Sequence, residues 1–405
     1  MTGKKILEVF YHGQLVGRLA ETPDRLVAFQ YDDDWIKNGF SLNPFSLPLD
    51  NRVFVPEEKS RERFGGLFGV FADSLPDAWG QLLLERYLGE KGVDTDSVST
   101  LDRLAYVGHS GMGALEYHPS KEKEFGLDAG GLDFDSISEE CGKILSSKKS
   151  DQLDMLYRMG GSSGGTRPKL FLNKEGRDWI VKFPAKNDPE ISGKREYDYY
   201  FCAKKCGIVM TDSVLIKSSV CDGYFMTERF DRKGENRIFT ETFAGLLEAD
   251  FRMPACDYAT LMKLVRVLTK ENVYDKEQLF RIMCFNVMTH NMDDHVKNFS
   301  LLFTEEKGWR LAPAYDLTYS DTYWGEHTTS VNRKGKDIKP EDLLKVGTDA
   351  GLKKDQCIQC ISDITEKTED LSEYLKKKPG RKKNHIPFEQ RIIEYFDDDS
   401  MTKKE

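Results

Sequence analysis

The segment HNMDDHVKNFSLL, residues 290–302, holds the densest group of polar side chains in the sequence. It follows an amphipathic stretch and leads into an apolar run, so its charged residues are expected in a loop between two buried elements. Within it, Asp293 and Asn298 lie five residues apart. Protein kinases have this separation in the loop HRDxxxxN, where the Asp orients the attacking hydroxyl and the Asn holds magnesium. The spacing therefore indicates phosphoryl transfer.

A third oxygen ligand is expected from Asp316, in LAPAYDLTYS. The preceding run FSLLFTEEKGWRLAP is predicted to be a short hairpin that returns the chain beside the first loop. Mg²⁺ prefers hard oxygen ligands and keeps several waters, so Asn298, Asp316 and phosphate oxygens make a plausible shell. Taken singly, an Asp or Asn in a loop is more often a turn or a helix cap. The combination favours the metal site.

A glycine-rich turn, GGSSGGTRPKL at residues 160–170, precedes these loops. Small residues allow backbone N–H groups to approach phosphate oxygens, although such runs are usually flexible linkers. Lys182, in DWIVKFPA, is expected on the next strand, where kinases place a phosphate-pairing Lys. Glu196 is its expected partner, because it shares an inward-facing helix surface with neighbouring apolar residues.

The segment YFMTERFDR, residues 224–232, is an apolar strand that ends in charged residues. It is expected to join two lobes, with backbone groups from Glu228 to Phe230 binding an adenine edge. The alternative is an ordinary edge strand with a surface ion pair.

The elements that must position these residues can be predicted from periodicity. Residues 4–19 and 169–182 are predicted hairpins, and helices are expected after Pro76 and from Ser192. The glycines of GHSGMGAL, residues 108–115, do not follow the order of a nucleotide-binding loop and predict a turn. Further helical patterns cover residues 243–247, 258–270, 276–290, 340–346 and 356–377.

This order predicts an α+β fold of the two-lobed protein-kinase type, with a small N-terminal α+β domain and an all-helical C-terminal lobe. The expected domains are residues 1–120, residues 121–235 with the glycine-rich loop, and residues 236–405 with the catalytic and metal loops. The length of 405 residues suits two or three cores.

The composition, 39% hydrophobic and 31% charged, suits a folded globular chain. A net charge of −9 argues against binding nucleic acid or a membrane surface through bulk electrostatics. The sequence has neither an apolar signal-peptide core nor a membrane-length apolar run, so a cytoplasmic protein is expected. Eight scattered cysteines fit reduced thiols, since neither Cys202/Cys206 nor Cys357/Cys360 is joined by further ligands at zinc spacing.

At these residues the sequence resembles the HipA family of bacterial toxin serine/threonine kinases, over nearly its whole length. The resemblance rests on GGLFGVFADSLPDAWGQLLL, GMGAL, SSGGTRPK, WIVKFPA, YFMTERFDR, ETFAGLLE, NMDDHVKNFSLL and LAPAYDLTYS, in the family's order. It implies a kinase that uses ATP and magnesium.

The residue roles implied by the resemblance fall into four groups. Asp293 is the catalytic residue, Asn298 and Asp316 bind metal, and Ser162 or Ser163 is autophosphorylated. The implied ATP-binding residues are Lys182, Glu228, Phe230, Gly164, Gly165, Lys169, Glu196 and His295.

The resemblance also implies partners and a cellular role. Such kinases pair with a small helix-turn-helix antitoxin, HipB-like, which binds operator DNA. They phosphorylate an aminoacyl-tRNA synthetase, glutamyl-tRNA synthetase in the best-known members, and so arrest growth and promote persistence. The basic run Lys376 to Lys383 is a further candidate for DNA contact, although such a run is more often a solvated loop.

Two departures from the family pattern concern loop regulation and protein-substrate choice. Gly-Gly-Thr-Arg precedes the loop Pro-Lys, where Ala-Gly-Ala-Gln is common, and Asp294 stands where a basic residue is common. Two alternatives remain open: a catalytically weak co-repressor that braces an antitoxin on operator DNA, and a small-molecule phosphotransferase.

Overall fold

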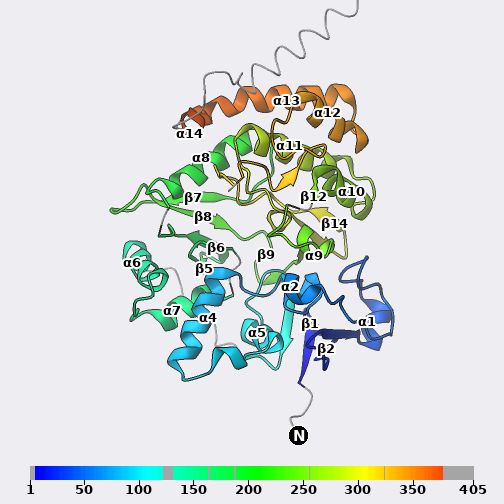
Figure 1. Cartoon of the computed structure of the whole chain (residues 1–405), viewed down its shortest axis with the longest axis vertical. Coiled ribbons are helices and arrows are strands. Elements are labelled where there is room, and N and C mark those ends of the chain that lie inside the picture. Colours follow the sequence, from blue (N-terminus) through cyan, green and yellow to red (C-terminus); the bar gives the residue numbers. More distant parts are fainter. Residues whose placement is uncertain are drawn as a thin grey trace, which may run out of the picture. The chain divides into compact units, whose positions relative to one another are not determined.

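The computed structural model describes residues 5–121, 131–162, 165–186, 188–254, 256–322 and 324–376. The chain forms two compact units: residues 1–194, 212–250 and 302–304 make the first, and residues 195–211, 251–301 and 305–405 the second (Figure 1). The expected N-terminal domain and most of the expected glycine-rich lobe fall in the first unit, and the boundary between them stays a prediction.

The first unit opens with an antiparallel sheet in the order β3-β2-β1-β4. The predicted hairpin at its start is confirmed, with a turn at His12 and Gly13. Its strands are β1 (Ile6–Tyr11), β2 (Gln14–Glu21), β3 (Val27–Tyr31) and β4 (Leu115–His118). The helices of this part are α1 (Asp33–Asn38), α2 (Ser60–Phe64), α3 (Gly69–Ala72), α4 (Ala78–Glu90), η1 (Thr95–Ser97) and α5 (Thr100–Val107).

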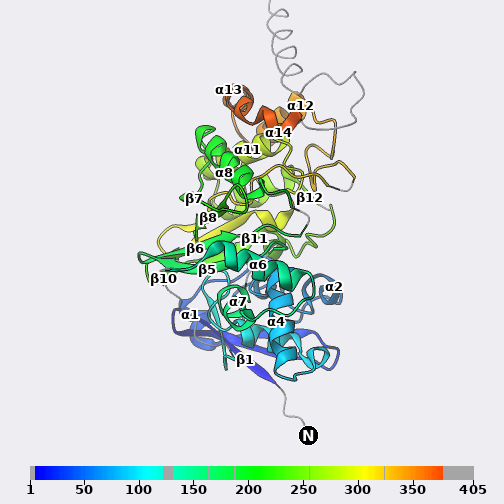
Figure 2. The ribbon, with the colours of Figure 1, turned by 90° about the vertical axis from the view of Figure 1, so that its left-hand side faces the viewer.

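A second antiparallel sheet in the same unit has the order β5-β6-β8-β7. Its strands are β5 (Lys169–Lys174), β6 (Arg177–Lys182), β7 (Ser213–Ile216) and β8 (Tyr224–Glu228). Helices α6 (Phe134–Leu145) and α7 (Leu153–Gly160) pack against it together with α4 (Figure 2). Trp79 of α4, Leu156 of α7 and Val181 of β6 belong to one hydrophobic core. The short elements β9 (Arg232–Lys233), β10 (Asn236–Arg237), β11 (Phe239–Thr242) and α9 (Phe243–Leu246) complete the unit.

The turn predicted at GHSGMGAL is confirmed, and buried charges hold it in place. The Asp231 carboxylate is 3% exposed and accepts hydrogen bonds from Gly113 N (2.8 Å), Arg229 Nη2 (2.7 Å) and Arg232 Nη1 (2.7 Å). Arg232 in turn donates to the carbonyls of Gly113 and Gly111, each at 2.9 Å. Burial alone would raise the pKa of Asp231, but Arg229 and Arg232 hold it below its usual range. The turn is therefore a structural clamp.

A group of buried acids lies elsewhere in the first unit. Glu241 is fully buried, and Asn43 Nδ2 donates to its Oε1 at 3.0 Å, while Oε2 has no hydrogen-bond partner among the described residues. Burial, followed by the carboxylates of Asp73 and Glu248, raises the pKa of Glu241 well above its usual range. Burial also raises the pKa of Glu248 to about 7, although the Gly69 N–H donates to it at 3.1 Å.

The second unit is mainly helical, but it also contains short strands, so the predicted all-helical C-terminal lobe is wrong on this point. Helix α11 runs through its core and buries Leu279, Phe280 and Met283. Its helices are α8 (Ser192–Lys205), which begins in the first unit, α10 (Tyr258–Leu268), α11 (Val273–Met288), η2 (Val296–Asn298), α12 (Pro340–Asp349), α13 (Lys354–Lys367), η3 (Thr368–Leu371) and α14 (Ser372–Lys376). The strands are β12 (Cys256–Asp257), parallel to β15 (Thr329–Ser330), and the predicted hairpin of β13 (Ser300–Thr304) and β14 (Gly308–Leu311), in which residues 302–304 of β13 belong to the first unit. The predicted α+β class is confirmed.

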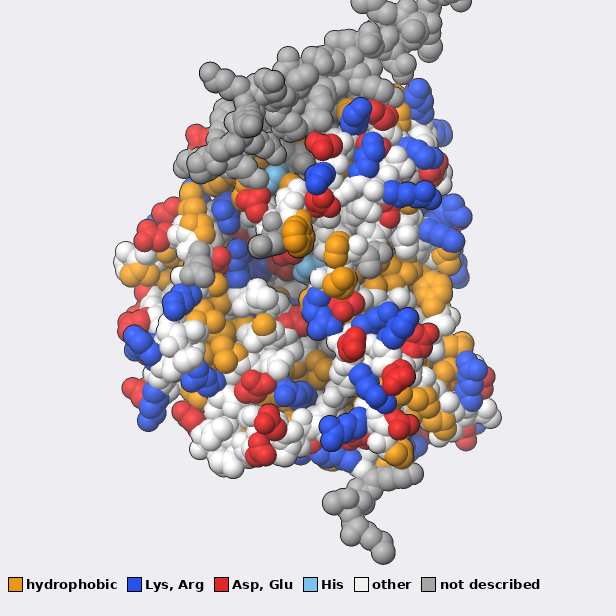
Figure 3. All heavy atoms as spheres, viewed as in Figure 1, with side chains coloured by type: hydrophobic (Ala, Val, Ile, Leu, Met, Phe, Trp, Pro, Cys, Tyr) orange, Lys and Arg blue, Asp and Glu red, His pale blue; other side chains and the backbone are white. Residues whose placement is uncertain are grey.

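The charged surface and the state of the cysteines are those expected from the composition. Figure 3 shows Lys and Arg interspersed with Asp and Glu over the face it presents. Within the described ranges, no helix is both long and apolar enough to cross a membrane. All eight cysteines lie in the described part of the chain and are free thiols. The basic run from Lys376 to Lys383 lies outside the residues whose side chains are described.

The first prediction concerns the pH dependence of stability. The folded-state pKa of Glu248, about 7, lies above the unfolded value of about 4.3, so its contribution to stability falls as pH rises from about 4 to about 7. We expect Glu248→Gln to remove this loss and to raise the free energy of unfolding at pH 8, relative to pH 5, by about 2 kcal/mol. Denaturation curves at both pH values measure it.

The matched control is Glu235→Gln, which removes an exposed carboxylate from the turn between β9 and β10. It should shift stability equally at the two pH values. Identical pH profiles for wild type and Glu248→Gln would contradict the prediction.

Candidate active site

The loop that follows α11 is held beside the segment that follows Asp316. His290 adopts a left-handed backbone conformation, φ +60°, and turns the chain at the helix end. The Met292 N–H then donates to the Ser320 carbonyl (3.1 Å), and the Ser320 N–H donates to the His290 carbonyl (3.2 Å). Two stretches that are separated by about 30 residues are therefore fixed side by side.

Asp293 is fixed by its backbone and leaves its carboxylate in solvent. Its N–H donates to Ser320 Oγ (3.1 Å), and its carbonyl accepts from Asn298 Nδ2 (2.8 Å). Its side chain is 60% exposed. A fixed main chain with a free carboxylate suits a residue that receives a substrate hydroxyl.

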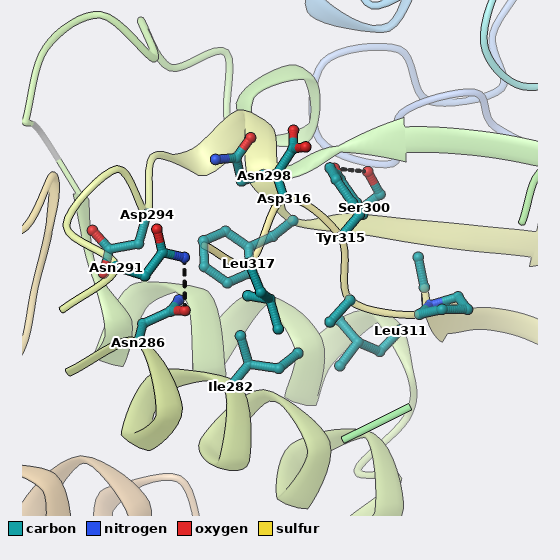
Figure 4. A pocket seen from close by; sticks show the side chains of 14 residues that line it. Ile282, Asn286, Asn291, Asp294, Asn298, Ser300, Leu311, Tyr315, Asp316 and Leu317 are labelled. Atoms are coloured by element: carbon teal, nitrogen blue, oxygen red, sulfur yellow. Dashed lines mark hydrogen bonds between the residues drawn. The ribbon is translucent and has the colours of Figure 1, made fainter. Parts of the chain in front are cut away.

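Asn298 and Asp316 line the same pocket. Figure 4 shows the amide of Asn298 and the carboxylate of Asp316 next to each other at its rim. Tyr315 fixes the two segments: its hydroxyl donates to the Lys297 carbonyl (2.8 Å) and lies 2.7 Å from Ser300 Oγ. Sequence patterns alone assigned no role to Tyr315, and the structure shows this bridging one.

The backbone of Asp316 is strained, with φ +54°. A non-glycine residue pays of order 1 kcal/mol for this conformation, which Asp and Asn tolerate better than most. The described residues contain no cluster of three or more His, Cys, Asp or Glu side chains that would suit a metal of higher ligand demand. One carboxylate and one amide oxygen fit Mg²⁺, which completes its shell with water and phosphate oxygens.

Asp294 is a buried residue whose packing the sequence did not predict. Its departure from the family pattern was linked to loop regulation and protein-substrate choice, and the structure shows that its side chain is only 1% exposed. Its Oδ2 accepts from Tyr258 Oη and His327 Nδ1, both at 2.9 Å, and its Oδ1 accepts from Thr329 N at 3.1 Å. Burial and this carboxylate raise the pKa of Tyr258 well above its usual range, so the phenol stays a donor. Asp294 therefore organises the loop from inside.

His295 lies beside the catalytic candidate. Its Nε2 is 3.9 Å from Asp293 Oδ1, beyond hydrogen-bond range, and its ring packs on Phe251 with centroids 5.4 Å apart. Nδ1 is buried and has no hydrogen-bond partner in the described part of the chain. The predicted contact of His295 with ATP stays a prediction.

The phosphate-binding candidates of the first unit also lie together. Lys169 of β5 and Lys182 of β6 are directly opposite in the antiparallel pair, so their side chains share one face of the sheet. Gly165, with φ +82°, lies so close to this group that an added Cβ would be 2.6 Å from Lys169 Nζ. Two neighbouring ammonium groups beside a glycine backbone suit a polyphosphate.

The glycine-rich turn is anchored to α4. The Gly165 N–H donates to Asp77 Oδ2 (2.7 Å), and Trp79 Nε1 donates to the Lys169 carbonyl (3.2 Å). Ser162 is 6% exposed, and its hydroxyl donates to the Ser110 carbonyl (3.2 Å). Ser163 and Gly164 lie outside the described residues.

The adenine candidates follow β8. The amides of Glu228 and Arg229 donate to the carbonyls of Asp212 and Asp178 at 2.9 and 2.8 Å, so an adenine contact would fall to other backbone groups near Phe230. The Glu228 carboxylate lies 3.3 Å from Arg177 Nη1.

Glu196 is buried on α8, with 4% exposure, and belongs to the second unit, whereas Lys182 belongs to the first. Their pairing stays a prediction.

A glycine-rich antiparallel sheet followed by a mainly helical unit with Asp, Asn and Asp loops defines a kinase-like fold. The HipA N-terminal domain matches residues 7–118, and the HipA-like C-terminal domain matches residues 161–371, which is more than half of the chain. The chain belongs to the HipA family.

Individual relatives agree with this placement. HipA of Shewanella oneidensis MR-1, solved with HipB and its operator DNA, superposes with a TM-score of 0.66 at 19% identity, covering 95% of this chain and 94% of that one. The predicted kinase-like fold is thus confirmed. Putative kinases Y4dM and Y4mE of Sinorhizobium fredii (strain NBRC 101917 / NGR234) are each 24% identical. The first match covers 98% of this chain and 97% of the relative, the second 85% and 81%.

The site predicts that Asp316→Asn weakens binding of Mn²⁺, a spectroscopically visible substitute for Mg²⁺, in the presence of nucleotide. Asn keeps the left-handed backbone and loses the charge, so affinity should fall about tenfold or more while the fold is kept. Electron paramagnetic resonance titration measures the free ion. Asp321→Asn, an exposed carboxylate on the same segment, is the control and should bind like wild type. Equal affinity of both variants would remove Asp316 from the metal site.

Proposed function

We propose that this chain is an ATP- and Mg²⁺-dependent serine/threonine protein kinase. The observation that carries the proposal is the arrangement of Asn298 and Asp316 at one pocket, with Asn298 hydrogen-bonded to the backbone of Asp293. This arrangement supports the proposal, because two candidate oxygen ligands and an exposed carboxylate belong to one locally braced pair of loops. Phosphoryl transfer needs these parts more than covalent chemistry, because catalysis is mainly positioning and charge neutralisation.

Each residue then has a distinct task. Asp293 orients the attacking hydroxyl and accepts its proton. Asn298 and Asp316 would hold Mg²⁺, which supplies positive charge to the phosphate oxygens. Lys169 and Lys182 bind the phosphates with their ammonium groups, and the backbone around Glu228 and Phe230 binds adenine.

The wider proposal is that the chain is the toxin of a HipBA-like type II toxin–antitoxin pair. It would bind a HipB-like helix-turn-helix antitoxin, and DNA mainly through that antitoxin. Its substrate would be an aminoacyl-tRNA synthetase, with glutamyl-tRNA synthetase first, and the outcome translational arrest and persistence. Family membership and the likeness to HipA, which was solved with HipB and operator DNA, support this part.

The central test is phosphoryl transfer by wild type and Asp293→Ala with labelled ATP and Mg²⁺. We expect the wild type to label itself and one synthetase, and the variant to lose about 10²-fold or more of the rate, because it lacks the hydroxyl-orienting carboxylate. Mass spectrometry of the chain and of added synthetases locates the label.

The control variant is Asp349→Asn, which changes an exposed carboxylate on α12 that pairs only with Lys345 in the described structure. It should keep the wild-type rate. A fully active Asp293→Ala would exclude the proposed role of Asp293, and absence of both label and ATP binding in wild type would favour the co-repressor alternative.

A separate prediction concerns regulation of the glycine-rich turn. A phosphate on Ser162 adds nearly two negative charges at a position that is now 6% exposed, so the turn must leave its place. Wild type preincubated with ATP and Mg²⁺ should therefore lose activity with time, and Ser162→Ala should keep it. Rates measured after increasing preincubation check this, with Ser163→Ala alongside. If Ser163→Ala alone keeps activity, Ser162 is not the regulated residue.

A further inference from the structure

Asp294 ends a continuous path of hydrogen bonds that begins at the backbone of Asp293. The Asp293 N–H donates to Ser320 Oγ (3.1 Å), and Ser320 Oγ donates to Asn291 Oδ1 (2.8 Å). The path continues from Asn291 Nδ2 to Asn286 Oδ1 at 3.0 Å, a bond drawn in Figure 4. It closes from Asn286 Nδ2 to Tyr258 Oη and from there to Asp294 Oδ2, both at 2.9 Å. Two consecutive catalytic-loop residues are thus joined through five bonds in series.

The chemistry of the two ends sets the direction of every bond between them. An ionised carboxylate only accepts and a backbone N–H only donates. Tyr258 donates its single hydroxyl proton to Asp294. The Tyr258 oxygen must therefore accept from the amide nitrogen of Asn286, and the amide oxygen of Asn286 is left to accept from Asn291. The Asn291 oxygen is left to accept from Ser320, and Ser320 can accept from Asp293. The path is consistent only with an acceptor at position 294.

The inner members of the path are buried, so a reversed or missing bond between them has no water to replace it. Asn286, Asn291 and Asp294 are 1%, 2% and 1% exposed, and Tyr258 is fully buried. Leaving one such group without a partner costs about 1–3 kcal/mol. This cost couples the side chain of Asp294 to the backbone position of Asp293.

Asp294 also holds the segment that follows the metal-binding candidate. His327 Nδ1 donates to its Oδ2 (2.9 Å), the Thr329 N–H donates to its Oδ1 (3.1 Å), and the Thr329 hydroxyl donates to its carbonyl. His327 is 6% exposed and Thr329 is fully buried. One carboxylate therefore fixes the catalytic loop and residues 327–329 together.

We propose that Asp294 is a positioning residue for phosphoryl transfer, which sets the polarity of this hydrogen-bond path and, with Tyr258 and His327, holds Asp293 in place. The inference rests on the proposed kinase function for its effect on catalysis. It also explains the acidic residue at this position, since a basic side chain would present donors where Tyr258, His327 and Thr329 all require an acceptor.

Four variants test the assignment. Asp294→Asn keeps the shape but has one acceptor oxygen for three donors, and Tyr258→Phe removes the link to Asn286. His327→Leu removes the donor to Asp294, whereas His327→Asn keeps a nitrogen donor at the place of Nδ1. Asp342→Asn is the matched control, because Asp342 is 2% exposed and accepts from Asn332 and Lys334 in the same unit, outside the path.

Two readouts separate this proposal from the proposed function. The first is kcat and KM for labelled ATP in self-phosphorylation, where misplacement of Asp293 should lower kcat about tenfold to a hundredfold and leave KM for ATP nearly unchanged. The second is amide hydrogen exchange of residues 290–298 and 327–331 in the free protein, which should speed up in the same variants whether or not the chain is a kinase.

We expect a lower kcat and faster amide exchange for Asp294→Asn, Tyr258→Phe and His327→Leu. His327→Asn should restore both kcat and exchange toward the wild-type values. Asp342→Asn should keep the wild-type kcat, although it loses about as much stability as Asp294→Asn. Wild-type exchange in Asp294→Asn would overturn the proposal, as would an equal loss of kcat in Asp342→Asn. A wild type without phosphoryl transfer but with the predicted exchange pattern would reject the kinase function and keep the positioning role.

Discussion

The buried carboxylate of Asp294 is the constraint on which the arrangement of the second unit's loops depends. A charge with 1% exposure is stable only when its acceptor sites are filled, and removing one partner from such a group costs several kcal/mol. Tyr258 of α10 and His327 and Thr329 of the segment around β15 fill those sites. Because these elements converge on one group, α10, the loop after α11 and the segment around β15 take their places together.

The first unit contains a pair of lysines, in contrast to the buried carboxylate of the second unit. Its phosphate-binding candidates, Lys169 and Lys182, lie opposite each other on adjacent strands, so two like charges share one face of the sheet. The turn beside them is tied to α4 through Asp77 and through Trp79, which also belongs to the core under the sheet. The N-terminal residues thus help to position the phosphate-binding candidates, which gives a physical reason for a family likeness that spans nearly the whole chain.

Local sequence signals predicted much of the fold and of the candidate site. The features that the sequence did not predict depend on contacts between residues far apart in the chain. The five-residue spacing of Asp293 and Asn298, the hairpin before Asp316 and the helical periodicities are properties of short segments, and the structure reproduces the corresponding elements. The partners of Asp294 lie 33 to 36 residues away, and the clamp on Gly113 comes from Asp231, 118 residues away. Strands β12 and β15 contain two residues each and pair although they are 73 residues apart in the sequence. No periodicity encodes such pairs, so the C-terminal lobe was predicted to be all helical.

The backbone of Asp316 bears on the choice between a kinase and an idle shell that only braces an antitoxin. A left-handed conformation at a non-glycine residue persists when the surroundings enforce it, and Tyr315 does so through Lys297 and Ser300. A scaffold without catalytic duty would gain about 1 kcal/mol from relaxing this residue or from glycine in its place. The strain instead presents a carboxylate beside Asn298 at the rim of a pocket. A carboxylate held beside Asn298 is what the proposed phosphoryl transfer requires, and this convergence supports that proposal over a purely structural role.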